Sequence, residues 1–183
     1  MLAPSPSAQL IEAFANTVNL EYGTDAIGTP EGLSAWLMQA GLADRDVRPN
    51  AVFHDRCLRL RAGIREVLGV NVGVDPVPDA LGTADEVLAA LPVHVGIDGR
   101  PLTPAAALPP ADAALAAIAV AWAEVRITGD AARLKRCAEH TCELVFWDVS
   151  KNRSRRWCSM RACGNRAKTR RYAARNADRR HSA

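Results

Sequence analysis

The sequence predicts a mainly α-helical protein with small β-hairpins, in which a helical N-terminal domain with one hairpin (1–132) precedes a C-terminal ββα unit (133–183). Three observations predict this arrangement. Apolar residues recur at helical spacing through most of residues 7–129, four of the five cysteines lie between positions 137 and 163, and the net charge changes sign just after Gly129. The last observation places the expected domain boundary.

The N-terminal domain is predicted to contain five helices and one hairpin. Apolar residues repeat at i, i+3 and i+4, and polar residues at the helix starts provide caps. The helices are expected at 7–20, 30–42, 48–69, 83–91 and 110–129, with Ser7, Thr29, Asn50 and Thr83 as N-caps and Val52 on the apolar face of the third. Residues 92–104 read as a strand, an Asp98-Gly99 turn and a short return, which is typical of a β-hairpin.

Charge is divided unevenly along the chain. Residues 133–183 carry 15 Lys and Arg against 4 Asp and Glu, a net charge of +11, whereas residues 1–132 carry −8. The basic part contains 12 Arg and 3 Lys, and the guanidinium group suits phosphates and guanine edges. The C-terminal part is therefore expected to bind a polyanion.

Other compartments and function classes are disfavoured. No apolar run approaches the ~20 residues of a membrane span, and the N-terminus lacks a basic segment before an apolar core. We therefore expect a cytoplasmic protein with no membrane partner. No catalytic set is recognisable, although His54 and Cys57 are i, i+3 on a predicted helix; Cys57 is interpreted as a small core residue.

The clustered cysteines have a regular spacing: Cys137-x4-Cys142, fifteen residues, then Cys158-x4-Cys163. Two pairs on short loops form the donor set of a structural four-thiolate zinc site, and a redox pair would instead take the form Cys-x-x-Cys. His140 lies inside the first loop, but four thiolates already complete the tetrahedron. We expect one structural Zn²⁺, although such a tetrahedron also accepts iron.

The residues around these cysteines predict a hairpin followed by a helix. Residues 142–150 alternate as a strand, with Leu144 and Phe146 on one face and Val145 and Trp147 on the other. Residues 150–154 read as a polar turn, 155–158 as a second strand, and 160–180 as a helix that carries two ligands at its start. This order is typical of a treble-clef-like zinc finger, whose metal compensates for a small core.

The stretch "WCSMRACGNRAKTRR" resembles the CGNR zinc-finger family through its Cys163-Gly164-Asn165-Arg166 signature. The resemblance extends back through "RCAEHTC" and "FWDVSKNRSRRWC". The N-terminal half is similar to the ABATE domain, on "AFANTVNL" and "TPEGLSAWLMQAGL". The resemblance implies a bacterial, stress-induced transcription regulator whose finger binds DNA.

The basic residues of the finger are the candidate nucleic-acid contacts. They are Lys151, Arg153, Arg155, Arg156, Arg161, Asn165, Arg166, Lys168, Arg170, Arg171 and Arg175. The first four are expected on the hairpin and the others along the helix, on one shared surface. Asn165 either reads adenine or braces the zinc loop, and Arg166 either contacts DNA or braces a thiolate.

Two other interpretations of the finger stay open. Structured RNA would be bound through the same charges, with Trp157 and the "FWD" aromatics as stacking platforms. A protein-interaction finger would meet an acidic partner, such as the −8 domain of its own chain. In that domain, Asn16 and Thr17 either line a small-molecule pocket or satisfy loop backbone, and its exposed face is the expected place for a homodimer.

Overall fold

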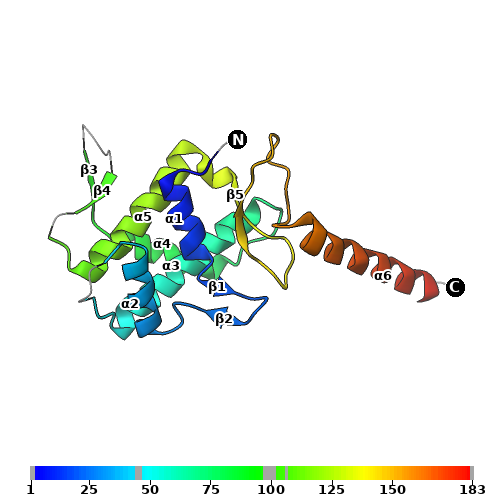
Figure 1. Cartoon of the computed structure of the whole chain (residues 1–183), viewed down its shortest axis with the longest axis horizontal. Helices are drawn as coiled ribbons and strands as arrows, with labels where there is room; N and C mark the ends of the chain where they lie inside the picture. Colours follow the sequence, from blue (N-terminus) through cyan, green and yellow to red (C-terminus); the bar gives the residue numbers. More distant parts are fainter. Residues whose placement is uncertain (1–2, 44–46, 97–101, 106, 182–183) are drawn as a thin grey trace.

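The computed structural model describes residues 3–43, 47–96, 102–105 and 107–181, which form a mainly helical body with three two-stranded hairpins (Figure 1). The elements are α1 (Pro6–Ala15), β1 (Val18–Asn19), β2 (Thr24–Asp25), α2 (Pro30–Gln39), α3 (Ala51–Val70), α4 (Pro78–Ala89), β3 (Val93–Val95), β4 (Leu102–Pro104), α5 (Pro110–Thr128), the 3₁₀ turn η1 (Asp130–Ala132), β5 (Leu134–Arg136), β6 (Val145–Trp147), the π turn η2 (Met160–Gly164) and α6 (Asn165–His181).

Helix α1 is shorter than the predicted helix at 7–20. Ser5, not Ser7, is its N-cap, since the Ser5 hydroxyl accepts the Ala8 N–H at 3.2 Å. The helix ends at Ala15, where the Thr17 hydroxyl donates to the Phe14 carbonyl. A polar side chain that captures backbone groups in this way competes with helix continuation. The chain then forms the β1–β2 hairpin, so the described residues of the N-terminal part form two hairpins and not one.

The next two helices begin where the sequence predicts. Thr29 Oγ1 accepts the Gly32 N–H at 3.1 Å, and Asn50 Oδ1 accepts the Phe53 N–H at 2.8 Å. Helix α3 is the long central helix, and it extends one residue beyond the expected stop at Gly69. Val52 was expected on its apolar face, but this side chain is exposed. It precedes the buried Phe53 by one residue, which is about 100° around the helix and off the buried stripe.

Helix α4 begins earlier than the predicted Thr83 cap. Pro78 starts it, because the fixed φ of proline suits the first turn and no N–H is lost there. Thr83 lies inside the helix and donates its hydroxyl to the Asp79 carbonyl. The two strands of the hairpin expected at 92–104 are present as β3 and β4, in which Val93 pairs with Pro104. The predicted Asp98-Gly99 turn lies outside the described residues.

Helix α5 contributes many side chains to the main core and ends as predicted. Gly129 has φ +80°, the left-handed conformation that favours glycine at a helix end. The core lies between α1, α3 and α5, and its fully buried side chains include Ile11, Phe14, Leu60, Leu115 and Ile118. Burial of such side chains supplies the main driving force of folding.

The C-terminal hairpin is β5–β6, which differs from the predicted pairing of 142–150 with 155–158. Leu134 pairs with Trp147 and Arg136 with Val145, while residues 155–158 contain no strand. The alternation within β6 is as predicted: Val145 and Trp147 enter the main core, and Phe146 packs with the cysteines. The division at 132/133 remains a prediction, since β5 and β6 share the core of the preceding helices.

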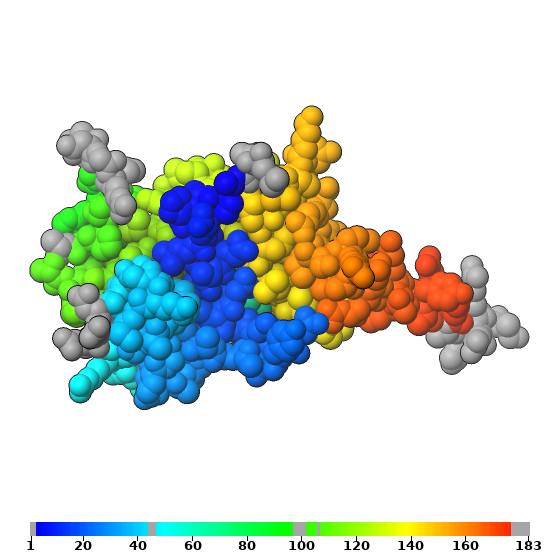
Figure 2. Space-filling view, viewed as in Figure 1, coloured from blue at the N-terminus to red at the C-terminus, as the bar shows by residue number. Residues whose placement is uncertain are grey.

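Helix α6 projects from the body (Figure 1), and the space-filling view shows it as a protruding arm (Figure 2). Within the part of the chain that the structure describes, no helix has the length and apolar character needed to cross a membrane. The mainly α fold with a C-terminal hairpin and helix around four cysteines agrees with the class that the sequence predicts.

Candidate metal centre and nucleic-acid interface

The first cysteine pair lies in the turn between β5 and β6. The Cys137 N–H donates to the Leu144 carbonyl at 2.9 Å, and the Cys142 N–H donates to the Glu139 carbonyl at 2.8 Å. Glu143 completes the turn with φ +50°. These bonds fold the turn back on itself, so that both thiols of the pair reach one site.

The second pair lies at the entrance to α6. The Ser159 hydroxyl accepts the Ala162 N–H at 3.2 Å, and the Gly164 N–H donates to the Ser159 carbonyl five residues earlier, which defines the π turn. Such wide turns are frequent at functional sites. This one brings Cys163, which is 1% exposed, back over Cys158.

The four sulfurs form one compact cluster. The Sγ atoms of Cys137, Cys142, Cys158 and Cys163 all lie within 4.8 Å of one another, and the Cys142–Cys158 and Cys158–Cys163 distances are both 3.6 Å. A zinc ion with Zn–S bonds of about 2.3 Å places its sulfurs roughly 3.8 Å apart. The donor set and its spacing therefore fit one tetrahedral Zn²⁺, and none of the four positions is left for a substrate.

Two N–H groups support the sulfurs from outside the cluster. The Cys158 backbone N–H lies 3.4 Å from Cys137 Sγ, and Arg166 Nη2 lies 3.4 Å from Cys163 Sγ. Donors of this kind offset the negative charge of a thiolate and orient it toward the metal. Arg166 also forms an ion pair with Glu21 at 3.0 Å, so one guanidinium joins the site to the β1–β2 turn.

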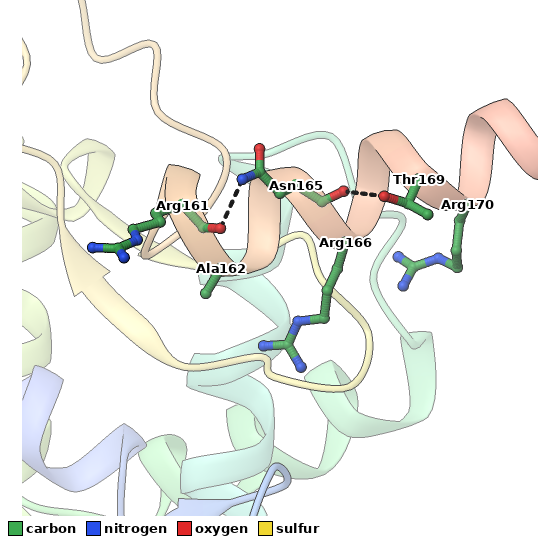
Figure 3. Close-up of a pocket in the computed structure, with 6 residues that line it drawn as sticks. All are labelled: Arg161, Ala162, Asn165, Arg166, Thr169 and Arg170. Atoms are coloured by element: carbon green, nitrogen blue, oxygen red, sulfur yellow. Dashed lines mark hydrogen bonds between the residues drawn. The ribbon is translucent and has the colours of Figure 1, made fainter.

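Asn165 braces the same region. Its Nδ2 donates to the Arg161 carbonyl at 2.9 Å, across the junction of the π turn and α6 (Figure 3). This hydrogen bond is of the kind expected for a bracing role, which is one of the two roles that the sequence left open for Asn165. Arg161, Arg166 and Arg170 are among the residues that line an open hollow of about 570 Å³ beside the helix. Figure 3 shows these side chains.

Glu139 and Arg170 form a clamp that sequence reasoning missed. Both Glu139 carboxylate oxygens accept from the Arg170 guanidinium at 2.7 Å, and the Glu139 side chain is fully buried. The Arg170 hydrogen bonds hold the pKa of Glu139 at about 2, against the opposing effect of burial. The sequence signal that could have predicted this pair was a glutamate two residues after the ligand Cys137. The clamp fixes α6 against the first cysteine turn.

Three basic residues at the start of the finger are internal. Arg133, Lys135 and Arg136 are at most 9% exposed. Lys135 Nζ donates to Asp148 Oδ2 at 2.8 Å, and both side chains are buried. Although burial opposes ionisation of Asp148, the bonds from Lys135 and Ser150 hold its pKa below the usual range. These cations contribute to the net charge of +11 but not to an exposed surface.

The predicted contacts before the second cysteine pair divide into two groups. Arg155 lies over the Phe146 ring at 4.9 Å and donates to the Cys158 carbonyl, and Arg156 donates to the Val72 carbonyl at 3.0 Å. Lys151 and Arg153 are exposed, and their side chains have no partner among the described residues. Lys151 and Arg153 lie at the expected turn, where the Arg153 N–H donates to the Ser150 carbonyl at 3.4 Å. Arg155 and Arg156 lie on a loop and not on the second strand expected from the sequence.

The predicted contacts on α6 also divide into two faces. Arg166 and Arg170 are four residues apart and face the site. Lys168, Arg171 and Arg175 lie at i, i+3 and i+7, which places them together on another face of the helix. We call these three residues the basic stripe. They are exposed and form no ion pair with any described residue, and Arg161 at the helix entrance is likewise exposed and without a side-chain partner there.

Asn16 and Thr17 bond to the protein itself. Asn16 Nδ2 donates to the Val145 carbonyl and its Oδ1 accepts the Val145 N–H, both at 2.8 Å, which ties α1 to β6. Thr17 Oγ1 accepts from Arg61 at 2.9 Å. Neither side chain lines the hollow beside α6 or the hollow between β1, α3 and β5.

The possible Cys57–His54 pair has no catalytic character. Cys57 is fully buried, and burial raises the pKa of its thiol to about 12, so it is not a nucleophile at neutral pH. His54 Nε2 lies 2.7 Å from the Ile27 carbonyl. The RNA-stacking hypothesis for Phe146 and Trp147 is also wrong, since both rings are buried in the two cores.

A metal centre of four cysteines, with a hairpin on one side and a helix on the other, defines the class of small structural zinc fingers. Comparison with protein families agrees: residues 133–176 match the model of the CGNR zinc finger. Residues 8–130 match the ABATE model, described as "Putative stress-induced transcription regulator", and the chain belongs to this family. Neither description is that of an enzyme family. No curated protein matches the chain.

Proposed function

We propose that the protein is a cytoplasmic transcription regulator that binds duplex DNA through helix α6, with Lys168, Arg171 and Arg175 as phosphate contacts. The observation that carries the proposal is the basic stripe. Its three cations are exposed, share one helix face and have no partner among the described residues. Cations left without internal partners are available to displace counterions from a polyanion.

The position of α6 and the contacts that hold its first turn support duplex DNA as the partner. The helix projects from the body that residues 1–132 form with β5 and β6 (Figure 1), and a single α-helix fits the DNA major groove. Zinc, the π turn and the Glu139–Arg170 clamp hold its base rigidly. Among the described residues the one ion pair between α6 and residues 1–132 is Arg166–Glu21. The acidic domain therefore leaves the basic stripe uncovered, which disfavours masking within the chain.

Affinity for DNA is tested by fluorescence anisotropy of labelled duplexes with the zinc-loaded protein across a salt series. We expect log K to fall with log[salt] by about 0.9 for each phosphate contact. The combined variant K168M/R171M/R175M should lose most of this slope and keep its zinc. R59M, which removes an exposed arginine of α3, is the matched control. Binding that does not change with the stripe variant would contradict the proposal.

The same assay separates the remaining alternatives. Competition with structured RNA of equal charge identifies RNA as the preferred partner if it displaces the duplex more strongly.

One helix contacts few phosphates, so we also propose that the protein binds DNA as a homodimer through residues 1–132. Sedimentation of the protein–DNA complex gives its stoichiometry, and a 1:1 complex at saturating protein would contradict dimeric binding.

A further inference from the structure

A hollow of about 210 Å³ lies between β1, α3 and β5, and none of the four cysteines lines it. Arg61 and Arg65 from α3 and Arg136 from β5 line it, and each residue is at most 8% exposed. We call it the arginine hollow. Three largely buried guanidinium groups around one space are unusual, because each must be paired to offset the cost of burial.

Two of the three arginines are fully paired. Arg61 binds both Asp25 carboxylate oxygens, at 2.6 and 2.7 Å. Arg136 binds both Glu66 oxygens, at 2.9 and 3.2 Å. Bidentate pairs of this kind are the strong form of the interaction. They fix the two guanidinium groups and neutralise them.

Arg65 is paired less well. Its Nη2 reaches Glu143 Oε2 at 3.3 Å, and the same oxygen accepts from Arg136 Nη1 at 3.0 Å. Its other bonds go to the neutral carbonyls of Ala15 and Glu143. Burial lowers the pKa of Arg65, and the nearby Glu143 carboxylate opposes this effect. Arg65 is therefore the cation of the hollow with the greatest need of an anion.

Donors remain free around this cation. Arg61, Arg65 and Arg136 donate to described residues through Nη1 and Nη2, and none of the three Nε–H groups has an acceptor among them. No buried side-chain nitrogen of the described residues is without a partner. The three Nε–H groups are consequently not fully closed off from solvent.

Besides the arginines, the lining contains the carboxylates Glu66 and Glu143, which pair with them, and apolar side chains. The apolar side chains are those of Val18, Leu20, Leu58 and Ala62. The volume equals that of about seven liquid water molecules, so only a small molecule fits. We propose that the arginine hollow binds a small organic monocarboxylate, with its carboxylate on Arg65 in competition with Glu143 and its apolar body against Val18 and Leu58.

The hollow adjoins the metal centre. Glu143 directly follows the ligand Cys142, and Arg136 directly precedes the ligand Cys137. A carboxylate that displaces Glu143 from Arg65 therefore acts on the turn that carries the first cysteine pair. The proposal that the hollow binds a carboxylate does not depend on DNA binding. An effect of the carboxylate on DNA affinity, in contrast, rests on the proposed function.

The test is isothermal titration of the zinc-loaded full chain, without DNA, with acetate, hexanoate and benzoate, each beside its neutral amide. At least one carboxylate should bind in preference to its amide by roughly tenfold, since the charge-assisted bonds are lost in the amide. Preference for none of the three would overturn the proposal. Because no DNA is present, this result is independent of whether α6 binds DNA.

Variants of opposite expected sign make the test specific. R65M should weaken carboxylate binding by roughly tenfold, and E143Q, which removes the competing charge, should tighten it by roughly threefold. R59M on the same helix should bind like the natural protein. If R65M fails to fold, judged by circular dichroism and zinc content, E143Q alone decides: unchanged or weaker binding would overturn the proposal.

Discussion

Residues 133–136 and residues 168–175 are both basic, yet the structure uses their charges in opposite ways. Arg133, Lys135 and Arg136 lie on or beside β5, where they are buried and bonded to Asp148, Glu66 and backbone carbonyls. The basic stripe lies on a projecting helix and has no internal partner among the described residues. The net charge of the segment therefore exceeds the positive charge that is available to a polyanion, because some of its cations are buried in ion pairs that stabilise the fold.

Removal of the metal should have the largest effect and separate the two regions. The apparent binding free energy of structural zinc is about 10–16 kcal/mol. We expect C163S, or chelation, to abolish DNA binding and to release α6, while Leu134 in β5 keeps its protection because it packs in the main core. Hydrogen exchange measured by mass spectrometry checks this for each segment.

The matched control for the metal experiment is C57A, which removes the cysteine outside the cluster and should retain one zinc per chain. Unchanged protection of α6 after chelation would contradict the idea that the metal holds the helix.

The second-largest effect is expected from breaking the buried Lys135–Asp148 ion pair. D148N leaves the Lys135 ammonium buried without its counter-charge, and breaking a buried pair in this way costs about 3–5 kcal/mol. D55N, at the exposed Arg59–Asp55 pair, should cost about 0.5 kcal/mol or less. Urea unfolding of the zinc-loaded proteins measures both. Equal losses would show that burial of the pair has no bearing on stability.

Substitutions of the adjacent residues Arg170 and Arg171 in α6 should then differ in their effects on stability and on DNA binding. R170M breaks the clamp on Glu139 and should lower Tm, whereas R171M should leave Tm within about 2 °C because it touches no described partner. For DNA binding, R171M should reduce the salt slope by about 1. Thermal unfolding and anisotropy on the same samples test the comparison, and a larger Tm loss in R171M would reverse the assignment.

The smallest effect is expected at Asn165. N165A removes the bond to the Arg161 carbonyl, and a single hydrogen bond of this kind contributes about 1 kcal/mol. If Asn165 only braces the helix, affinity should fall equally for all duplexes. An affinity loss confined to duplexes with one particular A·T pair would instead identify Asn165 as a base-reading residue.

Local signals in the sequence correctly predicted much of the fold. Thr29, Asn50 and Gly129 act at helix ends as expected, because capping depends on a few adjacent backbone groups. Thr83 was a wrong start, since Pro78 opened the same helix earlier. The hairpin partner of β6 was also wrong, because a three-residue strand with two charges, 134–136, lacks the alternation that identifies a strand.

By itself the sequence determined the helical class, the four cysteines and the basic character of the finger, since spacing and composition carry these properties. Only the tertiary structure decided which charges are free. Glu139 meets Arg170 across 31 positions, and Glu66 meets Arg136 across 70. Contacts between residues so far apart depend on how α3, β5 and α6 pack, and no local pattern encodes that packing.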